Sequence, residues 1–183
     1  MNHNHYLSSK QIPNILSLVN LTCGLLSVLV VFQHALPNNI RIGAILILTG
    51  ALIDGLDGKI ARYLNAESEL GQQLDSLADL VTFGVAPSCL LIASGILHHG
   101  FVAYATVIIY VLCGAYRLAR YNIANCSNCF QGCPITCAGA SIALLIFLAH
   151  IQTLFTINHW ALIIISLTLS LFMVSKVNIK RLI

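Results

Sequence analysis

All the acidic side chains of this 183-residue chain fall in one short stretch. The six acids lie between positions 54 and 79, in a largely apolar region: Asp54, Asp57, Glu67, Glu69, Asp75 and Asp79. The four aspartates form two pairs, spaced three and four residues apart, and either spacing places both side chains on one face of a helix. A carboxylate at membrane depth costs about 3 kcal/mol or more, so such acids mark a functional site. Four converging carboxylates repel one another unless cations lie between them, which predicts a metal site.

The chemistry of these side chains suits phosphoryl transfer. Carboxylate oxygens are hard ligands that favour Mg²⁺ or Mn²⁺. Two facing pairs could hold two ions about 3.5–4 Å apart, an arrangement that clamps a phosphoryl group during in-line displacement. The small residues Gly55, Gly58 and Ala61 remove bulk from the same surface, so a ligand could approach the backbone. Arg62, one helical turn after Gly58, could pair with a phosphate because its planar fork matches that group.

Two other interpretations of the acidic cluster remain open at this point. The acids could be structural and pair with Lys59 and Arg62, although four carboxylates would then face only two local bases. The cluster could also be the coordination site of a divalent-cation channel or carrier. The channel interpretation predicts acids in the middle of the spans and no adjacent pocket of small residues.

Composition indicates an integral membrane protein. Hydrophobic residues make up 58% of the chain, charged residues only 8%, and the mean hydropathy is +0.88. Soluble domains carry about 25% charged residues. The net charge of +3 gives no argument for nucleic-acid binding. The start of the chain is polar and does not have the pattern of a cleavable signal peptide.

The sequence predicts an all-α bundle of six transmembrane helices in one domain, residues 1–183, in which residues 1–12 form a polar N-terminal segment. Each span needs about 20 apolar residues. The predicted spans are 14–33, 40–60, 73–97, 101–121, 135–156 and 159–176. With the N-terminus inside, eight of the nine basic residues fall on the cytoplasmic side and only Arg41 falls outside. We therefore expect both termini and the acids to face the cytoplasm, in a prokaryotic-type cell membrane.

Seven cysteines are an odd number, and most would lie in spans or on the cytoplasmic side, where disulfides are not expected. Four of them have spacings superficially like those of a metal site: Cys126, Cys129, Cys133 and Cys137. Because Cys137 falls inside a span and Pro134 interrupts the run, we interpret them as ordinary loop and helix-end residues.

The acidic pattern, D-x2-D-G-x2-A-R-x8-G-x3-D-x3-D, resembles the signature of the CDP-alcohol phosphotransferases. These membrane enzymes move a phosphatidyl or phosphoalcohol group from a CDP-linked donor to an alcohol. Every defined position is matched from Asp54 to Asp79, including the eight-residue gap between Arg62 and Gly71. The resemblance implies six transmembrane helices, a homodimer and a two-metal site on the cytoplasmic face.

The same resemblance implies roles for individual residues. The metal ligands would be Asp54, Asp57, Asp75 and Asp79, with Asp79 also the general base. Contacts to the CDP-diacylglycerol donor would come from Gly58, Ala61, Arg62, Ser68 and Gly71, and from Asn14, Ser17 and Asn20 in the first span. The segment from Pro13 to Asn20 resembles the family's P-N-x2-T-x2-N, with Ser17 in place of the usual Thr.

The acidic pattern does not specify the acceptor alcohol, so another segment of the sequence must indicate it. Arg117 and Arg120 lie on one helical face near the cytoplasmic end of a span, where they could bind an anionic acceptor or a phosphate. The segment 113–122 resembles the C-G-x-x-R-L-A-R-[FY]-N block of the serine-using branch of the family. The segment 130–134 resembles that branch's F-x-G-L-P, with Cys133 in place of Leu.

These two blocks predict transfer of the phosphatidyl group from CDP-diacylglycerol to L-serine, with release of CMP. Glycerol 3-phosphate or an inositol phosphate remain alternative acceptors. The arginines could also be ordinary basic residues at the cytoplasmic end of a helix.

Overall fold

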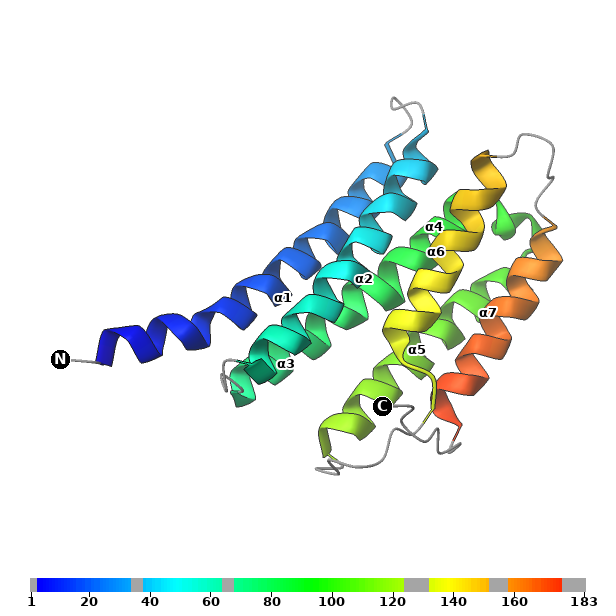
Figure 1. Ribbon diagram of the computed structural model, residues 1–183. Coiled ribbons are helices and arrows are strands. Elements are labelled where there is room, and N and C mark those ends of the chain that lie inside the picture. Colours follow the sequence, from blue (N-terminus) through cyan, green and yellow to red (C-terminus); the bar gives the residue numbers. More distant parts are fainter. Residues whose placement is uncertain (1–2, 34–37, 64–67, 124–131, 152–157, 176–183) are drawn as a thin grey trace.

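The computed structural model describes residues 3–33, 38–63, 68–123, 132–151 and 158–175, and of these it describes the backbone alone at 3–12, 60–63 and 151. Within these ranges every regular element is a helix, so the predicted all-α fold is confirmed (Figure 1). The elements are α1 (His3–Val31), α2 (Asn39–Tyr63), α3 (Glu69–Asp79), η1 (Leu80–Val85), α4 (Ala86–Ala93), η2 (Ile96–His99), α5 (Phe101–Ile123), α6 (Ile135–Ile151) and α7 (His159–Val174).

Six apolar helices correspond to the six predicted spans. Four are long and apolar enough to cross a membrane: Pro13–Val31, Asn39–Lys59, Glu69–Ala93 and Phe101–Ile123. The other two, Ile135–His150 and His159–Val174, are shorter apolar helices. The helix of the first span extends back to His3, into the segment predicted to be only polar and N-terminal.

The third span differs from its prediction at both ends. It begins at Glu69 and not at 73, because Ser68 caps its first turn. It ends at Ala93, not at 97, because Gly95 has a φ of 95° and terminates the helix. The short helix η2 follows and closes that end of the bundle.

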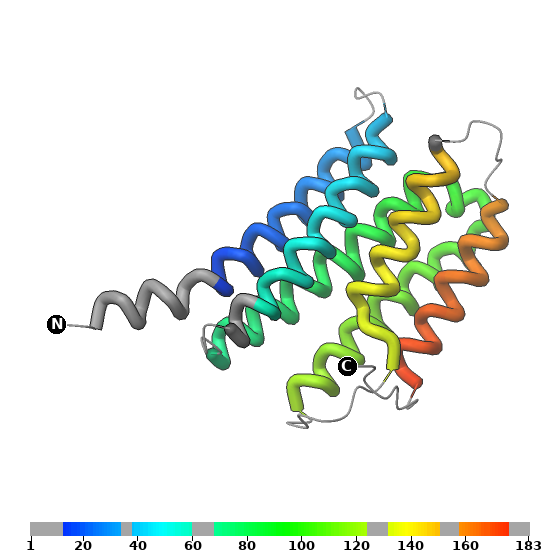
Figure 2. Tube along the Cα trace, in the orientation of Figure 1, coloured from blue at the N-terminus to red at the C-terminus, as the bar shows by residue number. Residues whose placement is uncertain are grey.

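The third span is the central helix of the bundle. Its three segments, α3, η1 and α4, run on without a break and pack against α1, α2, α5 and α6 (Figure 2). Of this helix 56% is buried, against 22–33% of the other three long spans. The helix that carries two of the aspartates is therefore held on several sides.

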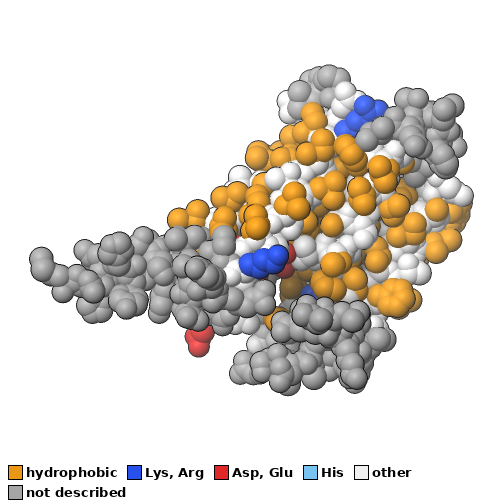
Figure 3. Space-filling model, viewed as in Figure 1, with side chains coloured by type: hydrophobic (Ala, Val, Ile, Leu, Met, Phe, Trp, Pro, Cys, Tyr) orange, Lys and Arg blue, Asp and Glu red, His pale blue; other side chains and the backbone are white. Residues whose placement is uncertain are grey.

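The outer surface of the bundle is largely apolar. Large hydrophobic side chains such as Leu29, Leu112 and Leu171 are exposed, and orange side chains cover much of the face in Figure 3. Such a surface suits a lipid environment, and with the long apolar helices it indicates an integral membrane protein.

The central helix is irregular at one point. Residues Leu80–Val85 form a π-turn, in which the amide of Ala86 donates to the carbonyl of Val81, five residues earlier. The turn begins directly after Asp79. π-turns of this kind occur often at functional sites.

The chain before α6 packs closely on the end of α7. The amide of Cys133 donates to the carbonyl of Phe172 at 3.2 Å. Gly132 has a φ of 79°, and a methyl group there would lie 2.7 Å from the Met173 carbonyl oxygen and 2.9 Å from that of Phe172. The glycine of the 130–134 block is thus required both by its backbone conformation and by the lack of space.

Gly132→Ala is expected to destabilise the protein strongly. A non-glycine residue in this conformation costs about 1–3 kcal/mol, and the methyl group must in addition displace the end of α7. Gly100→Ala is the matched control, because Gly100 also has a positive φ, of 59°, but no atom lies near the added methyl group. Thermal unfolding in detergent should show the larger decrease for Gly132→Ala. Equal decreases would mean that packing against α7 contributes nothing.

Candidate active site

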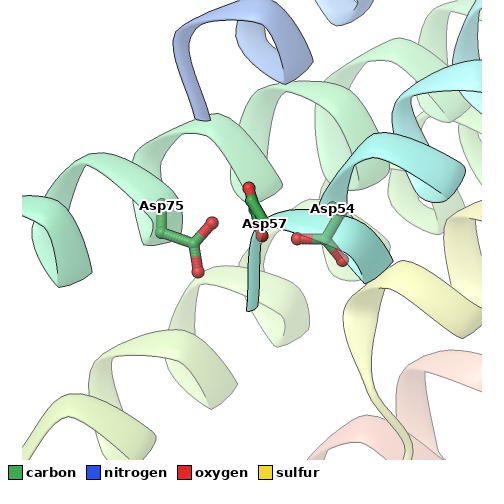
Figure 4. A group of neighbouring side chains, drawn as sticks. All are labelled: Asp54, Asp57 and Asp75. Carbon is green, nitrogen blue, oxygen red and sulfur yellow. The ribbon is translucent and has the colours of Figure 1, made fainter. Parts of the chain in front are cut away.

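Three of the four predicted aspartates converge. Asp54 and Asp57 project from α2, and Asp75 projects toward them from α3, with Asp57 between the other two (Figure 4). One carboxylate oxygen of each lies within 4.8 Å of those of the other two. The spacing of each pair on its helix brings these groups together, as the sequence predicted.

The burial of these groups fits a cation. Asp57 Oδ2 and Asp75 Oδ1 are buried and accept no hydrogen bond from the described residues. Leaving a carboxylate oxygen buried and unpaired is costly, so the donor set calls for a positive ligand. Within the described part of the chain no lysine or arginine forms an ion pair with the three acids, Lys59 included. This argues against purely structural acids, although the Arg62 side chain lies outside the description.

The fourth aspartate, Asp79, stands beside the other three. It is buried, it accepts a hydrogen bond from Asn20 Nδ2 at 3.4 Å, and it lies within hydrogen-bonding reach of Asp54. The structure places Asn20, which was predicted to contact the donor, against Asp79, and its Oδ1 is buried without a described partner. All four aspartates therefore form one cluster.

Thr136, near the start of α6, also belongs to this cluster. Its Oγ1 donates to Asp54 Oδ2 at 3.1 Å. Side chains that orient a metal ligand in this way tune the site. The sequence analysis missed Thr136, and its only signal there is its position just after Pro134, at the first turn of a helix.

The part of α1 around Asn14 and Ser17 lies over the beginning of α3. The Ser17 hydroxyl donates to the Pro13 carbonyl at 3.2 Å and is also within hydrogen-bonding reach of Asp57. A methyl group at Gly71 would lie 2.7 Å from Asn14 Oδ1 and 3.0 Å from Ser68 Oγ. Gly71 is therefore needed for the close approach of these helices.

Ser68 has a structural role beside its predicted contact with the donor. Its Oγ accepts a hydrogen bond from the Gly71 amide at 3.0 Å and so caps α3. The cap fixes the start of the helix that carries Asp75 and Asp79.

Two glycines of α2 leave an open surface beside the acids. A methyl group at Gly55 or Gly58 would meet no described atom within 4 Å. The nearby Leu52 and Leu56 are exposed by 72% and 55%. A glycine inside a helix costs about 1 kcal/mol relative to alanine, and packing gives no reason for it here. Open backbone beside buried acids leaves room for a ligand.

Some predicted residues lie outside what the structure describes. These are the side chains of Ala61 and Arg62 and the residues Cys126 and Cys129. The described cysteines are free thiols, and none of them belongs to a group that could hold a metal ion.

The two arginines of α5 have different surroundings. Arg117 is 8% exposed, its Nε has no described partner, and it is close enough to Asp79 to interact with it electrostatically. Arg120 donates from Nη1 to the Val174 carbonyl at 3.2 Å, at the end of α7, and lies over the ring of Tyr116. A cation at a helix C-terminus is stabilising. Arg120 Nη2, like Arg117 Nε, is buried without a described partner, so each arginine keeps a donor for a ligand, and Arg117 in addition interacts with Asp79.

The same end of α5 is tied to α3. Asn122 Nδ2 donates to Ser76 Oγ at 3.1 Å, next to Asp75 in the chain. This contact, also missed by the sequence analysis, holds the arginine-bearing helix against the acid-bearing helix.

The fold and the cluster together define a membrane-embedded carboxylate site, built between two apolar helices and suited to a divalent cation. The chain belongs to the CDP-alcohol phosphatidyltransferase family, whose sequence profile matches residues 10–173. The resemblance noted from the acidic pattern is thereby confirmed.

Several similar proteins are named CDP-diacylglycerol–serine O-phosphatidyltransferase, and three of them match more than 90% of this chain. The one from Bacillus subtilis is 38% identical over 168 residues, which cover 91% of this chain and 88% of the relative. The one from Methanocaldococcus jannaschii is 34% identical over 93% of this chain and 74% of the relative. The one from Mycobacterium leprae is 32% identical over 93% of this chain, but this covers only 58% of that longer protein.

Proposed function

We propose that this protein transfers the phosphatidyl group of CDP-diacylglycerol to L-serine and releases CMP. The observation that carries the proposal is the convergence of Asp54, Asp57 and Asp75 on one point from two helices. The names of relatives that are similar over most of the chain support serine as the acceptor.

Two divalent ions, Mg²⁺ or Mn²⁺, are part of the proposal. The three converging aspartates would hold one ion, and Asp79 with its neighbour Asp54 would hold the second. The unpaired oxygens of Asp57 and Asp75 support the first of these two ions. When bound, the ions would neutralise the charge that develops on the phosphoryl oxygens.

The reaction needs a proton acceptor near the serine hydroxyl. Asp79 accepts this proton, and Asn20 orients its carboxylate. The serine oxygen forms a bond to the β-phosphorus of CDP-diacylglycerol, and the bond from that phosphorus to the oxygen of CMP breaks. The open backbone at Gly55 and Gly58 receives the donor, and Ser17 and Asn14 line the same end of the site.

Arg117 and Arg120 bind the serine carboxylate or the neighbouring phosphate, and Arg117 is the better supported of the two. It is buried, has a nitrogen without a described partner, and lies near Asp79. Ala61, Arg62, Ser68 and Gly71 complete the donor contacts in this proposal.

The acceptor is tested directly with purified protein. CDP-diacylglycerol and Mn²⁺ or Mg²⁺ are incubated separately with L-serine, glycerol 3-phosphate or an inositol phosphate, and CMP release is followed. We expect release with serine alone. Release only with a phosphorylated acceptor would place the protein in another branch of the family, and passage of divalent cations without CMP release would favour a carrier.

The active site and both termini face the cytoplasm in this proposal, because the basic residues gather at that end. Glu69→Cys and His98→Cys test it, since both native residues are exposed and lie at opposite ends of the central span. In a background without native cysteines, an impermeant thiol reagent should label Glu69→Cys only from the cytoplasmic face and His98→Cys only from the other. Labelling of both from one face would contradict the topology, and the cysteine-free parent controls for non-specific labelling.

The homodimer implied by the family belongs to the same proposal. Crosslinking in native membranes should give a species of twice the monomer mass, and a monomer at all crosslinker concentrations would contradict it.

A further inference from the structure

A proline follows shortly after the π-turn of the central helix. Pro87 has no amide hydrogen, so it cannot donate to the carbonyl four residues earlier, which is that of Phe83. In an α-helix the proline ring would also clash with this carbonyl. The helix opens into a π-turn over Leu80–Val85, and the Phe83 carbonyl is left without its usual backbone donor.

A side chain of another helix supplies the missing donor. The hydroxyl of Tyr110, on α5, donates to the Phe83 carbonyl oxygen at 3.0 Å, and Tyr110 is fully buried. No water reaches a carbonyl at this depth in a bilayer, so an unpaired one would cost free energy. The bond therefore fixes the π-turn to α5.

The π-turn is also held from two other sides. On α6, a methyl group at Gly139 would lie 2.7 Å from the Phe83 carbonyl oxygen, so that helix packs directly on the turn. On α1, the Asn20 carbonyl accepts a hydrogen bond from Thr82 Oγ1 at 2.9 Å. Asn20 also donates through its side chain to Asp79, the residue directly before the turn.

The turn determines how the two halves of the central helix face the rest of the bundle. A π-turn holds one more residue than an α-turn, which rotates the following helix by about 100°. Upstream of it, Asp79 is directed to the acidic cluster. Downstream of it, Leu90 and Leu91 are buried in the apolar core.

We propose that Tyr110 is a positioning residue for Asp79: its hydroxyl replaces the donor that Pro87 lacks, and so holds the π-turn that sets the Asp79 carboxylate beside Asp54. The inference deepens the proposed function and rests on it for the activity readout. Binding of Mn²⁺ is a second readout that does not depend on the acceptor.

The test compares Tyr110→Phe with Thr106→Val in the full-length protein. Thr106 lies one turn away on the same helix, is equally buried and bonds only to a carbonyl of its own helix, so its variant controls for the loss of a buried hydroxyl. We expect Tyr110→Phe to weaken Mn²⁺ binding, followed by electron paramagnetic resonance, by about three- to tenfold. Residues that hold a metal ligand directly typically cost about 10–100-fold. The kcat for CMP release should fall similarly, with the KM for serine unchanged.

A double-mutant cycle tests whether Tyr110 acts on Mn²⁺ binding through Asp79. If Tyr110 acts through Asp79, Tyr110→Phe should weaken Mn²⁺ binding in the wild-type background but add nothing in an Asp79→Asn background. Additive effects, or equal losses in Tyr110→Phe and Thr106→Val, would reduce Tyr110 to a packing residue and overturn the inference. Wild-type Mn²⁺ binding and kcat in Tyr110→Phe would overturn it as well. If Tyr110→Phe does not fold, Thr82→Val is used in its place, because it removes another hydrogen bond of the π-turn, the one to Asn20. Its Mn²⁺ binding and kcat are then compared with those of Thr106→Val in the same way. A wild-type protein that binds Mn²⁺ but releases no CMP would instead count against the proposed function.

Discussion

Asp57→Asn and Asp75→Asn are each expected to lower CMP release by about 10³-fold or more. Asparagine keeps the shape of the side chain but removes the negative charge, so the remaining acids would no longer balance the two divalent ions of the proposed function. Losing one group that stabilises transition-state charge already costs about 10²–10³-fold in an enzyme site, and here metal binding is lost as well. The measurement is CMP release with serine over a range of Mn²⁺ concentrations, beside Mn²⁺ binding to each variant.

Glu69→Gln is the matched control, because Glu69 is an acid of the same stretch but is exposed at the start of α3. It should keep wild-type activity. Excess chelator should abolish wild-type activity, and added Mn²⁺ or Mg²⁺ should restore it. Full activity in chelator, or in both asparagine variants, would mean that the acids have a structural role only.

Arg117→Ala is expected to lower kcat/KM for serine by roughly ten- to a hundredfold. This corresponds to one charge-assisted hydrogen bond of about 1.5–3 kcal/mol. In the proposed role the guanidinium binds and orients serine and transfers no proton, so most of the loss should appear in the KM for serine. Lysine at this position should restore only part of it, since it keeps the charge but loses the planar fork.

Arg120→Ala separates binding from helix capping. Its contact with the Val174 carbonyl predicts a lower unfolding temperature and a smaller change in serine kinetics than for Arg117→Ala. Arg41→Ala is the control, because Arg41 donates to the His150 carbonyl at the end of α6, at the opposite end of the bundle. It should change stability alone. Unchanged serine kinetics in Arg117→Ala would remove the chemical argument for serine.

The sequence was sufficient for much of the site because its ligands come in helical pairs. The i, i+3 spacing of Asp54 and Asp57 fixes their common face on α2 without knowledge of the fold. The apolar runs likewise predict the six apolar helices, four of which are long enough to cross a membrane. The ends of the spans were less accurate, because Gly95 and the cap at Ser68 decide them locally.

Contacts between helices far apart in the chain could not be predicted. Thr136 lies 82 residues from Asp54, and no spacing rule relates them. The contact between Tyr110 and Phe83 could not be predicted either, although Pro87 indicates from the sequence that one helix carbonyl lacks its backbone donor. The sequence pattern does not distinguish the surroundings of Arg117 from those of Arg120, because the difference depends on the position of α7.

In the proposed function, the open surface at Gly55 and Gly58, flanked by the exposed Leu52 and Leu56, gives the donor lipid a route to the acids. A face open toward the acyl chains admits a diacylglycerol sideways from its own leaflet, so the enzyme responds to a two-dimensional concentration. In mixed micelles, the rate should follow the mole fraction of CDP-diacylglycerol, and added detergent at constant total lipid should slow the reaction by surface dilution. Serine comes from the aqueous phase, so its saturation curve should depend on its bulk concentration alone.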